Sequence, residues 1–232
     1  MEFLSAIPAG GTLFNVVAVA LGSLLGLAVG RFIPERLNDR VFQCFGLFTL
    51  YMGTSMALQT KDAIVVLVSL VLGTLIGDCL RLDDRLNGLG DTLKERLHLS
   101  AGRFTQGFVT ATLLFCVGSM SIIGAIEDGL RHDPTLLATK GVMDGISSIL
   151  LAGSFGVGVL FSILPMAIYQ GALTFLSVWA QPFLTEQVCA NISGLGGLMV
   201  LGISLNLLGL MKLKLCDMLP ALVLVVAITL LV

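Results

Sequence analysis

Long apolar stretches separated by short polar segments make up most of the chain. A helix needs about 20 mostly apolar residues to cross the hydrocarbon core of a bilayer. The pattern predicts membrane spans at about 12–31, 41–58, 63–80, 105–124, 141–164, 166–184, 193–211 and 215–232. Their apolar residues run continuously and do not alternate as in a membrane β-barrel, which favours helices. We therefore predict an all-α fold, a polytopic transmembrane helix bundle of about seven to eight spans in one domain over 1–232.

The apolar sequence contains an internal duplication. The phrase LGSLLG at 21–26 returns as LGTLIG at 72–77, and each copy is followed by an acid-Arg-Leu-Asn tetrad. The predicted repeat unit is a span, an interfacial helix and a second span, and its copies cover about 12–60, 63–125 and, more weakly, 145–211. Internal repeats around a site near the membrane midplane are typical of many transporters.

Glycines recur at intervals of four residues in both copies of the phrase. They are Gly22, Gly26 and Gly30 in the first copy, and Gly73 and Gly77 in the second. Small residues at this spacing let helix backbones approach closely. We interpret these glycines as helix-packing positions.

The most polar part of the chain lies between the third and fourth predicted spans. Leucines recur there at helical spacing among charged residues, which predicts an amphipathic helix over 81–99 on the inner membrane surface. The segment 31–44 has the same character in a shorter form.

The distribution of Lys and Arg predicts the orientation. With the N-terminus outside, ten of these residues fall in inner segments, and three (Lys61, Arg131 and Lys140) fall outside. This asymmetry follows the positive-inside rule. We predict a multi-pass protein of the inner (cytoplasmic) membrane with its N-terminus outside.

Composition agrees with a lipid environment. Hydrophobic residues make up 56% of the 232 residues and charged residues only 12%, whereas soluble domains carry about 25% charged residues. The net charge of −2 and the lack of a basic stripe with aromatics give no reason to expect a nucleic-acid partner.

The sequence carries no signature of an enzyme. It contains no P-loop, no GxSxG elbow and no HExxH motif, and its five cysteines form no CxxC pair. We predict no catalytic residues, no metal site and no cofactor.

Acidic residues close to or within apolar stretches are the first candidates for a functional site. Asp144 lies about one helical turn inside the fifth predicted span, and Glu127 and Asp128 close the fourth. A charge at the bilayer centre costs about 2.5–3.5 kcal/mol on insertion scales, so such residues usually have a partner or a function. They could form a cation-attracting mouth; alternatively, Asp128 or Asp133 caps a helix.

Neutral polar residues complete the candidate set. Amides lie within three predicted spans, at Asn15, Gln170 and Asn206, and hydroxyls accompany glycines at Ser55, Ser119, Ser121 and Ser204. Glycine beside hydroxyls can loosen a helix and free its carbonyls for a transport site. The alternative is that these side chains only bond neighbouring helices or their own backbone.

Several motifs together carry a resemblance to a known family. In chain order they are GSLLG (22–26), IPER (33–36), GLF (46–48), SMAL (55–58), GFVTATLLFCVGSM (107–120), DGISS (144–148), YQGALT (169–174), LNLLG (205–209) and MLPAL (218–222). Over nearly the whole chain they resemble the bacterial membrane-protein family catalogued as domain of unknown function 554. The resemblance implies a bacterial inner-membrane protein. Members of the family often carry transporter labels, but the resemblance implies no established substrate.

The leading hypothesis is an integral membrane transporter or channel for a small ion or polar solute, with its site between repeats near the midplane. Asp144 would supply charge and the serines would supply oxygens. The chain is small for a self-contained pathway, which favours a homodimer in the lipid bilayer. The rival hypothesis is a non-transporting scaffold or sensor that docks a cytoplasmic partner through the basic helix 81–99. A third explanation of those basic residues is topology and anionic lipid.

Overall fold

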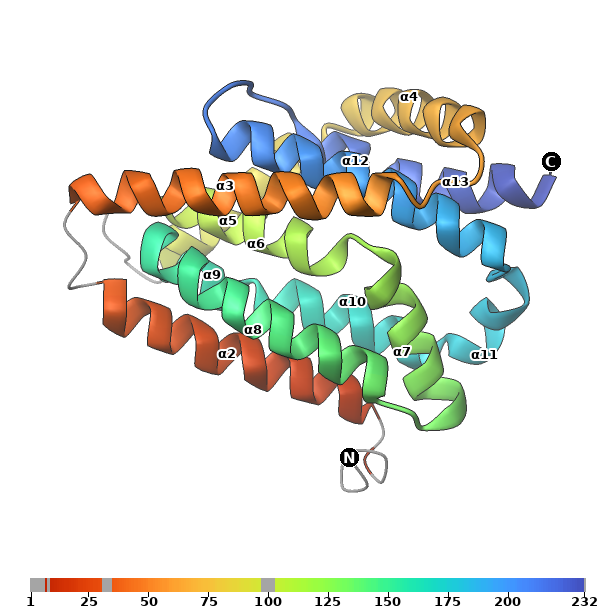
Figure 1. Cartoon of the computed structure of the whole chain (residues 1–232), viewed down its shortest axis with the longest axis horizontal. Helices are drawn as coiled ribbons and strands as arrows, with labels where there is room; N and C mark the ends of the chain where they lie inside the picture. Colours follow the sequence, from red (N-terminus) through yellow and green to blue (C-terminus); the bar gives the residue numbers. More distant parts are fainter. Residues whose placement is uncertain (1–6, 8, 31–34, 97–102, 232) are drawn as a thin grey trace. The chain divides into compact units, whose positions relative to one another are not determined.

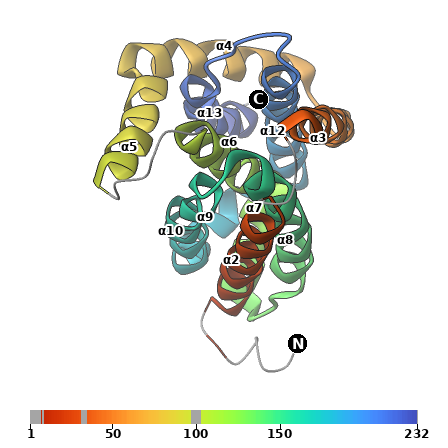
Figure 2. The same cartoon turned by 90° about the vertical axis from the view of Figure 1, so that its left-hand side faces the viewer.

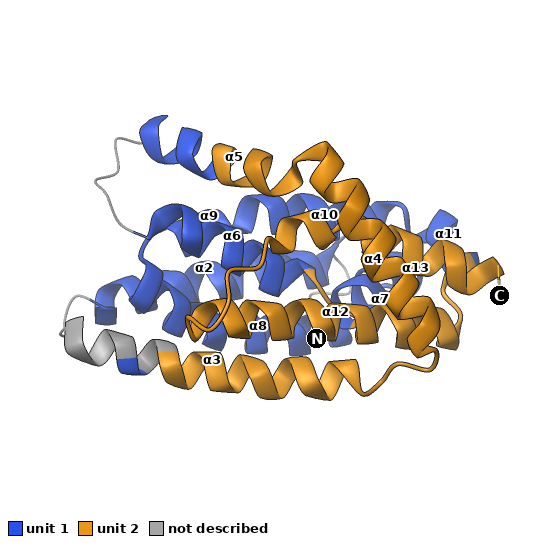
Figure 3. Cartoon of the chain, turned by 90° about the horizontal axis from the view of Figure 1, so that it is seen from above, with its two compact units in different colours: residues 1–41, 90–116, 120–182 blue, residues 42–89, 117–119, 183–232 orange. Residues whose placement is uncertain are grey.

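The computed structural model describes residues 7, 9–30, 35–96 and 103–231, and within these ranges it contains helices and no strands. The chain divides into two compact units, each assembled from separate segments of the sequence (Figure 3). Unit 1 comprises 1–41, 90–116 and 120–182, and unit 2 comprises 42–89, 117–119 and 183–232. The predicted all-α fold is confirmed.

Unit 1 is built around two long helices and a set of shorter ones. The long helices are α2 (Gly10–Gly30) and α8 (Thr135–Phe155). The shorter elements are α6 (Phe104–Cys116), α7 (Ser119–Arg131), α9 (Gly158–Phe161), α10 (Ile163–Phe175), α11 (Ser177–Ala180) and the 3₁₀ turn η1 (Gln181–Phe183). Ser119 at the start of α7 and Phe183 at the end of η1 already belong to unit 2. Figure 1 shows α2 and α8 running side by side.

Unit 2 contains most of α3 (Glu35–Ala57), together with α4 (Ala63–Leu80) and α12 (Glu186–Leu207). The 3₁₀ turn η2 (Leu215–Met218) and α13 (Pro220–Leu231) complete it. α5 (Leu82–Arg96) contributes residues to both units. The Asp62 carboxylate accepts hydrogen bonds from the first-turn amides of α4, which fixes where that helix begins.

Five described helices are long and apolar enough to cross a membrane, and a bent pair raises this to six. They are Gly10–Gly30, Ala63–Leu80, Thr135–Phe155, Gly158–Phe175 and Glu186–Leu207, with Phe104–Cys116 and Ser119–Arg131 as the bent pair. Each corresponds to one of the eight predicted spans. The predicted span 41–58 coincides with α3 as far as Ala57, and 215–232 falls on a shorter apolar helix. Crossings by these last two segments, and the internal repeats, stay predictions.

Three predicted boundaries differ from the structure. The span expected over 105–124 is broken after Cys116 and turns by 60°, with Gly118 at φ 135° in a conformation that favours glycine. The span expected over 141–164 ends at Phe155, because Gly156 has φ 82° and the chain restarts at Gly158. The interfacial segment expected over 31–44 is continuous with the following span from Glu35 onward. Local glycine geometry decides the first two differences.

The predicted amphipathic helix over 81–99 is present as α5, which begins at Leu82, and residues 97–102 lie outside the described part of the chain. Asp83 and Asp84 lie in its first turn and Lys94 and Arg96 in its last turn, where they complement the helix dipole. Its leucines at 82, 86 and 93 are half-buried, whereas Leu89 is exposed.

The first glycine series packs α2 against α8 in unit 1 (Figure 2). A Cβ at Gly22 would collide with the carbonyl oxygen of Gly145, and one at Gly26 with that of Ile149. One at Gly30 would lie 2.7 Å from the carbonyl oxygen of Gly153. The paired residue numbers increase together, so α2 and α8 are parallel and their backbones touch.

The second glycine series makes an equivalent contact in unit 2. A Cβ at Gly73 would strike the backbone of Ala221 in α13, and one at Gly77 would strike the backbone of Asp217 in η2. The numbers run in opposite directions, so α4 is antiparallel to this segment. α3 and α12 are also antiparallel, because Gly53 meets Leu201 whereas Gly46 meets Leu208. The glycines of both phrases therefore lie at helix contacts.

We expect Gly26→Ala to lower the stability of the protein by about 1–3 kcal/mol, because the new methyl group meets main-chain atoms that cannot move aside cheaply. The matched control is Gly171→Ala in α10, where an added Cβ has no neighbour within 4 Å. That control should be neutral or stabilising, by up to about 1 kcal/mol. Thermal unfolding of the purified proteins in detergent measures both. Equal effects at the two positions would contradict the close α2–α8 contact.

Candidate functional site

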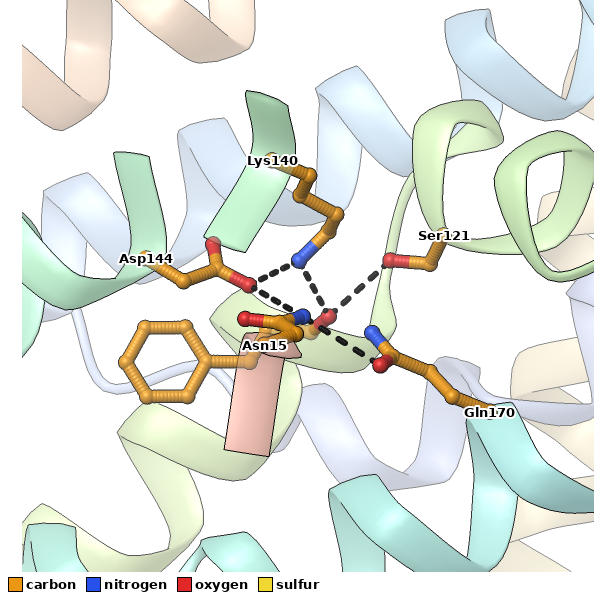
Figure 4. A network of polar contacts seen from close by, with 6 residues as sticks. Asn15, Ser121, Lys140, Asp144 and Gln170 are labelled. Atoms are coloured by element: carbon orange, nitrogen blue, oxygen red, sulfur yellow. Dashed lines mark hydrogen bonds and ion pairs between the residues drawn. The ribbon is translucent and has the colours of Figure 1, made fainter. Parts of the chain in front are cut away.

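Five helices of unit 1 place polar groups in one buried network (Figure 4). α2 contributes Asn15, α8 contributes Lys140 and Asp144, and α10 contributes Gln170. The break between α6 and α7 adds a backbone carbonyl and the Ser121 hydroxyl. The network lies within helices apolar enough to span a membrane, where unpaired polar groups are costly.

An ion pair between Lys140 and Asp144 is the charged part of the network. The two residues are four apart on α8, a spacing that places their side chains on one face of the helix. Lys140 is only 6% exposed and Asp144 only 8%. Charges this deeply buried are tolerated because each neutralises the other.

The ammonium of Lys140 also donates to the carbonyl oxygen of Phe115, at 2.8 Å. In an unbroken helix this carbonyl would accept from the amide of residue 119, four residues on. The break after Cys116 frees it. The Ser121 hydroxyl donates to the same oxygen at 3.0 Å. The Phe115 carbonyl thus accepts one hydrogen bond from α7 and one from α8.

Asn15 connects the ion pair to α10. Its amide nitrogen donates to the Asp144 carboxylate at 3.1 Å and to the Gln170 side-chain oxygen at 3.2 Å. Both amide side chains are fully buried. The bonding pattern assigns the nitrogen of Asn15 to the side that faces Asp144 and Gln170.

Two atoms of this network have no hydrogen-bond partner, namely Asn15 Oδ1 and Gln170 Nε2. The other such buried side-chain atoms among the described residues are Ser23 Oγ in α2 and Thr112 Oγ1 in α6. All four belong to unit 1. A buried polar atom without a partner costs about 1–3 kcal/mol, so among the described residues this cost falls on unit 1.

Buried polar side chains continue from the network toward the helix ends. The hydroxyls of Thr12 and Thr174 lie 3.4 Å apart, one helical turn from Asn15 and Gln170. Asp128 in α7 accepts from the amide of Gly11 at 3.0 Å and so caps α2. Asp128 and Asp144 thus contact α2 four residues apart, or about 6 Å along its axis.

The structure brings together four of the ten predicted site residues: Asn15, Ser121, Asp144 and Gln170. Asp128 lies one turn further along α2, whereas Glu127 is half-buried on α7. Near the same end of α8, Asp133 accepts from the amide of Thr135, and hydrogen bonding to Thr135 lowers the pKa of the Asp133 carboxyl.

The remaining four predicted residues belong to unit 2, and three of them form hydrogen bonds within that unit. Ser204 donates to the carbonyl oxygen of Gly46, Ser119 pairs with the Ser193 hydroxyl, and Ser55 is exposed on α3. The Asn206 side-chain amide forms two hydrogen bonds with the backbone of Leu213. It donates to the Leu213 carbonyl and accepts from the Leu213 N–H. Asn206 therefore closes the loop after α12.

Lys140 and the Phe115 carbonyl are the members of the site that sequence reasoning missed. Lys140 counted as a loop charge in the predicted topology, but it is buried within α8. Its position four residues before Asp144 in an apolar helix was the available signal. No sequence signal marks a backbone carbonyl, because Phe115 becomes a ligand through the bend that follows it.

The network presents polar groups of several kinds. Among the described residues, no three His, Cys, Asp or Glu side chains gather as a metal site would require. One carboxylate, one ammonium, two amides, one hydroxyl and one freed carbonyl remain.

Comparisons with known proteins agree with the membrane character of these helices. The model of a family described as "Protein of unknown function (DUF554)" matches residues 10–230. An uncharacterized membrane protein of Bacillus subtilis, YdfK, is 33% identical over 216 residues, covering 91% of this chain and 92% of the relative. An uncharacterized protein of Escherichia coli, YqgA, is 29% identical over 222 residues, covering 92% and 93%. No solved structure gives a significant match.

We expect Lys140→Met to destabilise the protein by about 3–5 kcal/mol, because it leaves the Asp144 carboxylate buried without its counter-ion. The double variant Lys140→Met/Asp144→Leu removes both charges and should recover most of the loss. Thermal unfolding in detergent, run on the wild type and both variants, measures the coupling. A double variant no more stable than the single one would contradict a direct ion pair.

Proposed function

We propose that this chain, which belongs to the DUF554 family of proteins of unknown function, is a transporter or channel for a small ion or polar solute. The observation that carries the proposal is the ion pair of Lys140 and Asp144, buried in a helix apolar enough to span a membrane. Ionisable residues inside membrane helices are rare and usually mark an ion or substrate pathway.

The broken helix beside the ion pair supports the same function. Transporters typically bind their cargo where a membrane helix is interrupted and its freed carbonyls face the site. The α6–α7 pair has this form, since it bends by 60° and offers the Phe115 carbonyl to the network. The polar line through Thr12 and Thr174 provides a direction of approach from the helix ends.

Helix directions within each unit support eight crossings with alternating direction. Two parallel spans need an odd number of crossings between them, and three predicted spans lie between α2 and α8: the one within α3, α4 and the bent pair. Two antiparallel spans need an even number. Four candidates separate α4 from α13, four separate α3 from α12, and four separate α2 from α10.

The burial of Lys140 increases the difference in Lys and Arg content between the two predicted sides of the membrane. When the buried Lys140 is not counted as a loop residue, two Lys or Arg residues remain at predicted outer positions, against ten at predicted inner positions. This supports an N-terminus on the outer side of the cytoplasmic membrane under the positive-inside rule.

The rival proposal is a scaffold or sensor that docks a cytoplasmic partner through α5. The exposed Arg85 and Arg96 are compatible with it. The simpler explanation is that basic residues at the last turn of α5 complement its dipole and face lipid headgroups. The buried network of unit 1 has no role in that proposal, so the two are separable by experiment.

A flux measurement tests the proposal. Purified protein in liposomes on a solid-supported membrane would be challenged with jumps of H⁺, Na⁺, K⁺, small anions and metabolites. We expect a protein-dependent current that Asp144→Asn reduces to the background, because the carboxylate supplies the charge of the site. Asn15→Ala and Gln170→Ala should weaken it.

The matched control is Thr139→Ala, which changes an exposed hydroxyl of α8 beside Lys140 that is bonded only within its own helix. Its current should equal that of the wild type. Asn206→Ala should lower stability and leave the current of the folded fraction intact. Folded protein that is silent across the panel, or a current unaffected by Asp144→Asn, would count against the proposal.

A further inference from the structure

The ammonium of Lys140 is held entirely by oxygen atoms in its described contacts (Figure 4). Its partners are one oxygen of the Asp144 carboxylate and the Phe115 carbonyl oxygen. These are the groups from which membrane proteins build sites for small cations: a carboxylate and the carbonyl at the end of an interrupted helix. The ammonium therefore occupies the kind of position that a free cation would take.

The C-terminal end of α6 favours positive charge at this position. Phe115 is the second-last residue of the helix, so its carbonyl belongs to the partly negative end of the helix dipole. Because the chain bends at Gly118, this end is directed at the network and is not extended by a further helical turn. The bend thus supplies a ligand and a favourable field together.

The charge balance selects the valence of the ligand. One carboxylate faces one ammonium, so a monovalent cation in place of the ammonium leaves the network neutral once the Lys140 amine has released its proton. A divalent cation would leave one buried positive charge. An anion would add a second negative charge beside Asp144. Either excess is costly in a buried position.

Two buried polar atoms of the network have no hydrogen-bond partner, namely Asn15 Oδ1 and Gln170 Nε2. The side-chain nitrogen of Asn15 donates to Asp144 at 3.1 Å, so this amide holds the carboxylate in place beside the freed carbonyl.

We infer that the Asp144 carboxylate, held in place by Asn15, and the Phe115 carbonyl form a binding site for a monovalent cation, in which the ammonium of Lys140 is the resident competitor. The inference rests on the proposed function and names its cargo class. Lys140 neutralises Asp144 whenever the cargo is absent; when a cation binds, the ammonium gives up one proton to water and becomes a neutral amine, so the net charge of the buried network does not change. Lysine at this position therefore weakens the site and keeps it reversible.

Removal of the competitor tests the inference. Purified wild type, Lys140→Ala and Lys140→Ala/Asp144→Asn would be melted in chloride salts of Li⁺, Na⁺, K⁺, Rb⁺, NH₄⁺ and N-methylglucamine at equal ionic strength. We expect Lys140→Ala to be stabilised by at least one small cation relative to N-methylglucamine. The expected rise in Tm is about 3–6 °C at roughly ten times the Kd.

The controls make the result specific. The double variant should lose the cation response, because the carboxylate is gone, and the wild type should respond less than Lys140→Ala. If Lys140→Ala does not fold in any salt, Lys140→Gln takes its place, since its amide can still donate to Asp144. A folded variant with the same Tm in every salt would overturn the inference. So would stabilisation of the wild type by small anions that Lys140→Ala abolishes.

The inference and the proposed function fail in different ways. A cation response of Lys140→Ala without flux of any solute by the wild type would support the site and contradict transport. A current that depends on Asp144, without any cation response in the lysine variants, would support transport and contradict the cation site.

Discussion

α2 and α8 lie backbone to backbone because glycine stands where they touch. Gly22, Gly26 and Gly30 face main-chain atoms of α8 at distances that exclude a Cβ. The same contact surface continues to Gly141, where an added Cβ would lie 3.1 Å from the Cα of Asn15. The 3.1 Å hydrogen bond between Asn15 and Asp144 depends on this close approach. Helix packing by small residues therefore determines the geometry of the candidate site.

The buried ion pair and the helix break depend on each other in a similar way. Lys140 needs a second acceptor besides Asp144, and the Phe115 carbonyl is available only because α6 ends there. In turn, the freed carbonyl lies in an apolar region and needs donors, which Lys140 and Ser121 provide. A straight helix over 104–131 would remove the acceptor and leave the ammonium less well paired.

The sequence was sufficient for the helical class and for most of the spans, because a run of about 20 apolar residues has few other solutions in a bilayer. It also marked Asn15, Ser121, Asp144 and Gln170, since polar residues in such runs need partners. It could not separate them from Ser204 or Asn206, whose bonds to Gly46 and Leu213 depend on tertiary contacts. Lys140 was assigned to a loop because the start of α8 is less apolar than its middle.

Buried amide side chains differ between the two units in how completely they are hydrogen-bonded. In unit 2, Asn191 accepts from the amides of Lys61 and Asp62 and donates to Thr229. Such fully used amides hold helices together and leave nothing for a ligand. In unit 1, Asn15 and Gln170 each keep one atom unpaired beside a buried charge pair. A network that gives up stability in this way is expected where a ligand completes it, which is why the proposed function is assigned to the polar network of unit 1.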